Sequence, residues 1–179
     1  LDFSDGFSGS RHVLFSALRL GNLQTHINGS LLDNSSPLRT NDFYRLHARA
    51  VYDFEKGWVG AKISAEDNQQ RFKANDSLTP FSQKFFGYEV FAGVGDSTGV
   101  FVEAGYRNRV YDSIRDMDLQ RVSEANTLYV KSQLLQTENT QLSVFANYRV
   151  LKDVEGIRED EQSLNSRVLF NQSFLNKGI

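Results

Sequence analysis

The sequence is defined first by what it lacks. Its 179 residues contain no cysteine, which excludes disulfide bonds, thiolate metal sites and a cysteine nucleophile. Only two prolines are present, and this favours long uninterrupted strands because proline cannot donate to a β-ladder. No window approaches the roughly 18–20 consecutive apolar residues of a membrane-spanning helix. The formal charge of −2 lacks the basic excess typical of a nucleic-acid-binding protein.

The sequence has instead a two-residue alternation of apolar and polar side chains, the pattern of a strand whose two faces meet different environments. Residues 44–54 place Tyr, Leu, Ala and Phe on one face, and Arg, His and Asp mostly on the other. After a turn at 55–57 the alternation resumes in residues 59–66. The pattern predicts an antiparallel hairpin with one apolar and one charged face.

The same pattern recurs along the chain and predicts an all-β fold. We expect an antiparallel up-and-down meander of about nine strands, each of about ten to thirteen residues. The alternation covers residues 23–31, 44–54, 59–66, 86–94, 100–107, 128–134, 142–150 and 164–171, and residues 11–20 form a further expected strand with apolar residues on both faces. Residues 1–179 therefore form a single β-meander, which we expect to be a fragment of a larger barrel.

The connections are of two kinds that alternate strictly. Tight turns are expected at 21–22, 55–57, 95–98 and 137–140, and long polar loops at 33–41, 67–80, 112–124 and 152–163. In a meander, alternate connections lie at opposite ends, so all tight turns should lie at one end and all long loops at the other. Residues 113–126 also fit a short surface helix.

This combination favours a transmembrane β-barrel over a soluble sheet. Globular strands usually have five or six residues, whereas a tilted membrane-spanning strand needs about 9–11. Membrane barrels also combine short turns at one end with long loops at the other, an apolar outer band and a polar interior. A soluble β-rich surface domain remains the alternative, because a sheet with one solvated face shows the same alternation.

The charged face then has to point into an aqueous lumen. A Lys or Arg on the lipid face would cost about 2–4 kcal/mol near the bilayer midplane. We therefore predict these lumen-facing residues: Arg45, His47, Arg49, Lys62, Glu66, Glu89, Glu103, Arg107, Arg109, Lys131 and Arg149. Both signs of charge are present, which does not indicate a strongly selective ion path.

Aromatic residues cluster near the expected strand ends and predict two interfacial girdles. Tyr52, Phe54 and Trp58 would form the girdle at the tight turns. The girdle at the long loops would contain Phe43, Tyr44, Phe85, Phe86, Tyr88, Tyr106, Tyr111, Tyr129 and Tyr148.

Two segments carry a family resemblance. Residues 87–113 (GYEVFAGVGDSTGVFVEAGYRNRVYDS) and 163–174 (SLNSRVLFNQSF) resemble internal segments of large outer-membrane β-barrel proteins of the Bacteroidota. The resemblance implies a location in the bacterial outer membrane and transfers no activity, because that group is mostly of unassigned function. The lipid bilayer would be the main partner, with other outer-membrane or periplasmic proteins as further candidates.

Catalytic and metal-binding motifs do not emerge from the sequence. The three histidines have no metal-ligand spacing, and the glycines at 93–99 lie in a hairpin turn rather than before a helix. Acidic loops lack the ordered ligand spacing of a calcium loop. We therefore expect no enzyme activity and no cofactor, with an in-barrel serine hydrolase based on His26 or His47 as a weak alternative. The expected function is a structural or transport segment of the barrel, serving passage, export or surface assembly.

Overall fold

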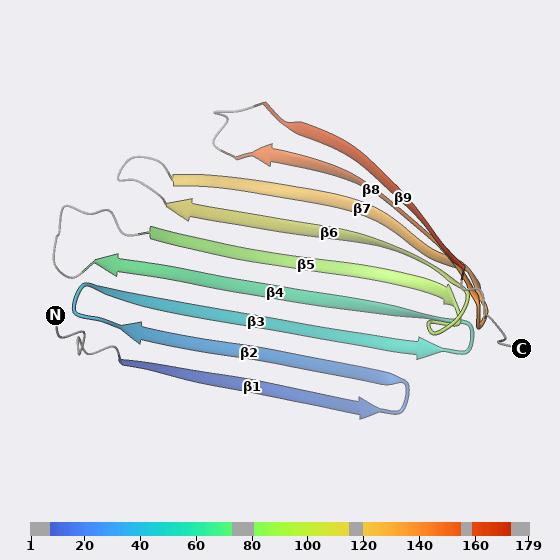
Figure 1. The fold of residues 1–179 in the computed structure, drawn as a ribbon, viewed down its shortest axis with the longest axis horizontal. Helices are drawn as coiled ribbons and strands as arrows, with labels where there is room; N and C mark the ends of the chain where they lie inside the picture. The colour runs from blue at the N-terminus through green and yellow to red at the C-terminus, as the bar shows by residue number, and fades with distance from the viewer. Residues whose placement is uncertain (1–7, 73–80, 115–119, 155–158, 173–179) are drawn as a thin grey trace, which may run out of the picture.

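A computed structural model describes residues 8–72, 81–114, 120–154 and 159–172. These residues form one antiparallel sheet of nine strands, in which each strand pairs with the next along the chain (Figure 1). The strands are β1 (Ser8–Leu20), β2 (Leu23–Ser35), β3 (Arg39–Phe54), β4 (Gly57–Phe72), β5 (Phe81–Gly95), β6 (Phe101–Ile114), β7 (Gln120–Gln136), β8 (Thr140–Asp153) and β9 (Glu161–Gln172). The predicted all-β antiparallel meander is confirmed.

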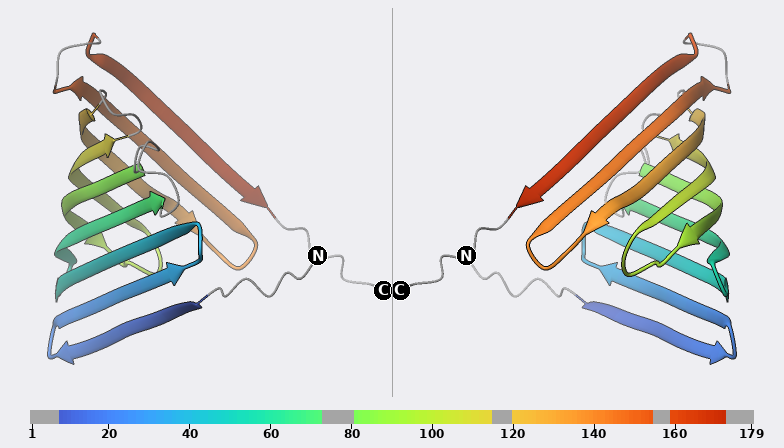
Figure 2. Two further views of the ribbon diagram at one scale, coloured as in Figure 1. Left: turned by 90° about the vertical axis from the view of Figure 1, so that its left-hand side faces the viewer. Right: turned by 90° about the vertical axis from the view of Figure 1, so that its right-hand side faces the viewer.

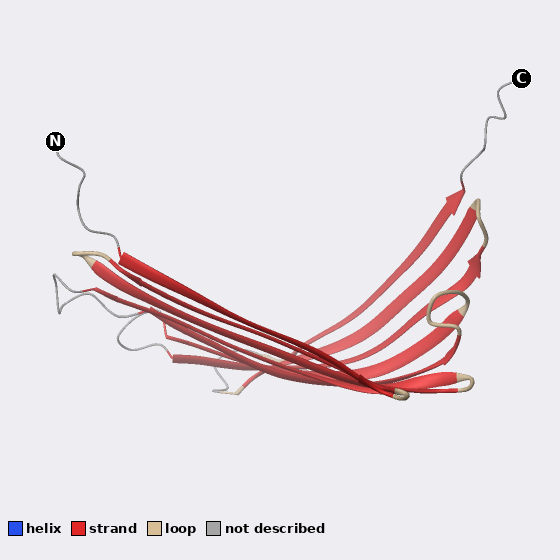
Figure 3. Cartoon of the chain, turned by 90° about the horizontal axis from the view of Figure 1, so that it is seen from below, coloured by secondary structure: helices blue, strands red, loops and turns tan. Residues whose placement is uncertain are grey.

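The sheet is strongly curved and, within the described residues, open. Figures 2 and 3 show it bent into a trough, with β1 and β9 at its two edges. Strand contacts in the described part of the chain join only consecutive strands, so β1 and β9 do not pair with each other. The structure therefore gives the meander without a closed barrel.

The four hairpin turns lie together at one end of the sheet, as the alternation of connections predicts (Figure 1). Gly21 has a φ of +57° in the two-residue turn between β1 and β2, a conformation that glycine adopts without steric cost. In the β5–β6 turn, the backbone N–H and the hydroxyl of Thr98 donate to Oδ1 of Asp96 at 2.9 and 2.8 Å. These hydrogen bonds lower the pKa of Asp96, the backbone one most strongly.

At the opposite end, the strands extend into segments that the sequence pattern predicts to be loops. Residues 67–72 belong to β4 and residues 120–124 to β7, which also rules out a helix over 120–126. The parts of the predicted loops at 73–80, 115–119 and 155–158 lie outside the described residues. Backbone pairing continues beyond the apolar pattern, and polar side chains such as Gln69 hydrogen-bond along the strand. The strands are therefore 12 to 17 residues long.

The strand register assigns every side chain to one of two faces, because directly opposed residues share a face. Leu46, Ala65 and Phe86 form one such row, and Arg49, Lys62 and Glu89 form another on the opposite face. We call the first the apolar face and the second the polar face. In the described residues, no helix is long and apolar enough to cross a membrane.

Candidate functional site

All the residues predicted to share a charged surface do lie on the polar face. Register rows connect Arg49 with Lys62, Glu89 and Arg107 across four consecutive strands. Other rows join the remaining predicted residues to this face. They pair Arg45 with Glu66, His47 with Ser64, Glu103 with Lys131, Gly87 with Arg109, and Thr127 with Arg149. The sheet thus gathers the eleven predicted residues from β3 to β8 on one side.

Glu89 on β5 is the centre of a buried ion-pair network. Lys62 Nζ lies 2.7 Å from Oε1 of Glu89, and Arg107 Nε and Nη2 both lie 2.7 Å from Oε2. The hydroxyl of Tyr129 donates to Oε1 at 2.9 Å. The Glu89 side chain is only 7% exposed. Charged donors on both carboxylate oxygens compensate the loss of water that burial imposes.

Glu103 on β6 forms a second centre that is joined to the first. Lys131 Nζ lies 2.9 Å from Oε1, and Trp58 Nε1 donates to Oε2 at 2.9 Å. The Tyr129 hydroxyl also reaches Oε1 of Glu103, at 3.1 Å, so it bridges Glu89 and Glu103. Two of these contacts skip a strand, because Trp58 reaches across β5 and Tyr129 reaches across β6 to Glu89.

Glycines on the polar face make room for the aromatic rings of this network. Gly93 lies under the ring of Trp58, Gly60 under Phe91, and Gly105 under Tyr129. Trp58, Phe91 and Tyr129 are buried, together with the neighbouring Val51. Glycine and aromatic partners of this kind fill a sheet surface while allowing the sheet to bend. The burial on this face indicates that the sheet curves towards it.

Replacing Gly105 with Ala should therefore destabilise the fold. A Cβ at this position would lie 2.6 Å from Cζ and from the hydroxyl oxygen of Tyr129, so the ring would have to leave its place between the two glutamates. We expect a loss of about 1–3 kcal/mol of unfolding free energy, as for an overpacked core. Gly29→Ala is the control, since its Cβ would meet its nearest atoms at an ordinary 3.7 Å. Urea unfolding followed by fluorescence of Trp58, the only tryptophan, would measure both; equal midpoints would contradict the expectation.

Three of the arginines predicted for the polar face have no carboxylate partner among the described residues. Arg49 and Arg109 instead lie over aromatic rings, with Cζ 5.8 Å from the ring centroids of Phe91 and Phe85 respectively. Arg149 on β8 is exposed and forms no ion pair within the described chain. The sequence pattern places these arginines on the face correctly but gives no sign that they stay unpaired.

A Ser–His–acid cluster lies towards the end with the long connections. His47 Nδ1 is 3.0 Å from Ser64 Oγ, and His47 Nε2 is 3.8 Å from Oε1 of Glu66. The second distance is too long for a hydrogen bond. Arg45 Nε holds the same Glu66 oxygen at 3.1 Å. His47 thus has the serine contact of a triad but not the carboxylate contact that would orient its ring.

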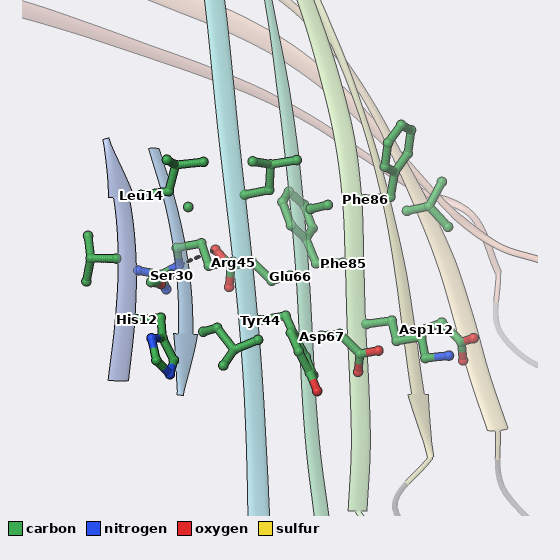
Figure 4. Close-up of a pocket in the computed structure, with 17 residues that line it drawn as sticks. His12, Leu14, Ser30, Tyr44, Arg45, Glu66, Asp67, Phe85, Phe86 and Asp112 are labelled. Carbon is green, nitrogen blue, oxygen red and sulfur yellow. Dashed lines mark ion pairs between the residues drawn. The ribbon is translucent and has the colours of Figure 1, made fainter. Parts of the chain in front are cut away.

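The apolar face is broad and free of charge over its central part. From β3 to β6 its side chains lack Asp, Glu, Lys and Arg in the rows from Leu46 to Phe54. The Asp, Glu, Lys, Arg and His residues of this face in the described strands lie towards the long connections and are His12, Asp33, Asp42, Asp67, Arg71, Lys84, Asp112, Glu124 and Lys152. A groove crosses β1 to β6 at this border, where Tyr44 and Phe86 meet Asp67 and Asp112 (Figure 4).

The aromatic residues predicted to form the two girdles are divided between the two faces of the sheet. Tyr44, Tyr52, Phe54, Phe86, Tyr88, Tyr106 and Tyr148 lie on the apolar face. Phe43, Trp58, Phe85, Tyr111 and Tyr129 lie on the polar face, where they cannot face lipid together with the first group. The two-residue alternation of the sequence already places each of these five residues on the same face as charged neighbours, and the girdle prediction did not take this into account.

The described residues contain no cluster of three or more His, Asp or Glu side chains able to hold a metal ion. Comparison of the chain with protein-family models and with curated proteins finds no match. The contacts described on the polar face are ion pairs and hydrogen bonds between side chains.

Proposed function

We propose that this chain forms part of the wall of a transmembrane β-barrel in a bacterial outer membrane, with the polar face lining an aqueous lumen. Its role would be the passage or export of solutes or the assembly of surface structures. The observation that carries the proposal is the contrast between the faces. One face of a single-layer sheet is exposed and uncharged over its central part, and the other holds a network of buried ion pairs.

The height of the apolar face supports a membrane setting. Tyr44 is paired with Asp67, so the uncharged stretch that β3 to β6 share runs from the row of Leu46 to that of Phe54, eight residues further along β3. At a rise of about 3.3 Å per residue this stretch is about 26 Å long. A strand tilt of about 40° reduces it to about 20 Å, somewhat less than the roughly 25 Å apolar band of membrane barrels.

The exposure of the apolar side chains also supports a membrane setting. Val90 and Val130 are 49% and 46% exposed, although they lie in the middle of their strands. A soluble sandwich would need a second layer over these residues, and the described residues form one layer. A large exposed apolar surface of this kind needs a lipid or protein cover.

The absence of cysteine allows a direct test with single labels. The substitutions Val130→Cys and Thr127→Cys lie on the same strand and on opposite faces. In vesicles containing the full chain, we expect a fluorophore attached to the Val130→Cys variant to be quenched by lipids with nitroxide-labelled acyl chains. The Thr127→Cys variant should instead react with thiol reagents that do not cross the membrane.

The same preparation distinguishes the soluble alternative. A barrel should need detergent for solubility and should change its gel migration on heating. A folded, monodisperse chain in plain buffer, with the thiols of both variants equally open to aqueous reagents, would overturn the proposal and favour a soluble surface domain.

We infer no hydrolase activity from the cluster of Ser64, His47 and Glu66. Glu66 is already paired with Arg45, and 3.8 Å separates it from the histidine ring, so the ring is not held for proton transfer. A fluorophosphonate probe should therefore leave Ser64 unmodified. Labelling that disappears in Ser64→Ala and in His47→Ala would reverse this conclusion.

A further inference from the structure

We propose that the polar face presents a positive surface that attracts and binds small anionic solutes carrying carboxylate or phosphate groups. The inference deepens the proposed function and rests on it, because it names the solutes that the lumen would accept. Net charge is its starting point. The eleven predicted residues contain seven Lys or Arg and three Glu, although the whole chain is close to neutral.

The excess of positive charge is larger at the surface, because the carboxylates are more deeply buried than the cations. The side chains of Glu89 and Glu103 are 7% and 5% exposed, whereas those of their partners Lys62, Arg107 and Lys131 are 38%, 33% and 44% exposed. The carboxylates thus lie against the sheet and the cations lie above them. A solute on this face meets the ammonium and guanidinium groups first.

The arginines without a carboxylate partner add donors that are free for a ligand. Arg49 and Arg109 rest on Phe91 and Phe85, which limits the motion of their side chains without using their N–H groups. The planar guanidinium group matches carboxylate and phosphate oxygens with two parallel hydrogen bonds. Arg149 is exposed beside Thr127, its register partner. These groups are spread over β3, β6 and β8, so the positive surface extends across the face.

Thr127 is the position from which to measure this surface. It lies in a register row between Arg107 and Arg149. In the full chain carrying Thr127→Cys, the rate of thiol modification can be compared for an anionic and a cationic methanethiosulfonate, the sulfonatoethyl and trimethylammonioethyl reagents. Each rate is divided by that of a free thiol. At low ionic strength, where the Debye length is about 30 Å, we expect the anionic reagent to react faster.

Removing one cation should lower this preference. A unit charge about 8 Å away in water changes each rate by a little more than twofold, so adding Arg149→Gln should reduce the anionic-to-cationic ratio by about fivefold. Lys152→Gln is the matched control, because Lys152 lies on the same strand but on the apolar face. Its charge is farther from Thr127, so it should lower the ratio clearly less than Arg149→Gln does.

Competition identifies the anion. Bound anions should slow modification of the Thr127→Cys thiol by the uncharged reagent methyl methanethiosulfonate. Inorganic phosphate and succinate are each compared with chloride at equal ionic strength. The stronger competitor distinguishes phosphate from carboxylate recognition, and Arg149→Gln should weaken the effect.

The outcomes separate the two proposals. A ratio at or below one, or protection by neither anion, would overturn the anion proposal while leaving the aqueous lumen in place. Failure of the Thr127→Cys variant to react with any aqueous reagent would instead overturn the lumen itself.

Discussion

Val90→Arg should prevent the chain from reaching its folded, membrane-inserted state. Val90 lies in the middle of β5 on the apolar face and is 49% exposed. If that exposed surface faces lipid, an arginine there places a guanidinium group near the bilayer midplane, at a cost of about 2–4 kcal/mol. The heat-modifiable form of the protein, measured on gels after refolding into vesicles, should be strongly reduced.

A control variant on the polar face tests whether the effect of Val90→Arg comes from placing the charge on the apolar face. Thr127→Arg introduces the same side chain on the polar face, in the centre of β7. It should allow insertion, although one more cation beside Arg107 and Arg149 will cost some stability. If both variants insert equally well, the apolar face does not meet hydrocarbon.

The alternation of side chains was sufficient to predict the faces of the sheet. Each residue predicted for the charged surface lies on the polar face, from Arg45 on β3 to Arg149 on β8. The reason is that a strand has a strict two-residue period, and antiparallel pairing carries one face across all neighbours. A meander with short turns leaves few other ways to pair the strands.

The ends of the strands could not be predicted in this way. The apolar pattern stops near Glu66, whereas β4 continues to Phe72. Backbone hydrogen bonds do not depend on the polarity of side chains, so the ladder extends beyond the apolar band. The same limit applies to β7, where a register shift between Gln133 and Leu135 interrupts the alternation.

The network around Glu89 could be predicted only in part. Its ion pairs with Lys62 and Arg107 join register partners on adjacent strands, whereas the hydroxyl of Tyr129 on β7 reaches Glu89 on β5. Neither residue spacing nor register predicts a contact that skips a strand. Such contacts depend on curvature, which in turn depends on glycines such as Gly105 that leave space for a ring.

The network has a direct consequence for the proposed lumen. The ion pairs hold the buried carboxylates of Glu89 and Glu103 against the sheet and leave the cations of their partners more exposed, so a lumen lined by this face would be positive where it meets water. Stability and the proposed solute preference can be tested separately, because the first would depend on the buried carboxylates and the second on the unpaired arginines.

Glu89→Ala should test the stabilising role with a large effect. The substitution leaves Lys62, Arg107 and the Tyr129 hydroxyl without their shared acceptor. Lys62 and Arg107 are 38% and 33% exposed, so water can reach the charges that remain, and the loss should be smaller than the roughly 3–5 kcal/mol of a fully buried pair but larger than the about 0–1 kcal/mol of an exposed one. The urea midpoint of the folded chain in detergent, followed by Trp58 fluorescence, should fall accordingly.

Glu66→Ala provides the comparison for this prediction. Glu66 also pairs with an arginine, Arg45, but its side chain is 30% exposed and water can replace the lost contact. Exposed pairs contribute about 0–1 kcal/mol, so the midpoint should change little. Equal losses in Glu89→Ala and Glu66→Ala would mean that water reaches both carboxylates equally well. In that case the Glu89 network would not hold the strands of the wall together, and the stability of the sheet would have to come from its backbone pairing and the aromatic rings packed over glycine.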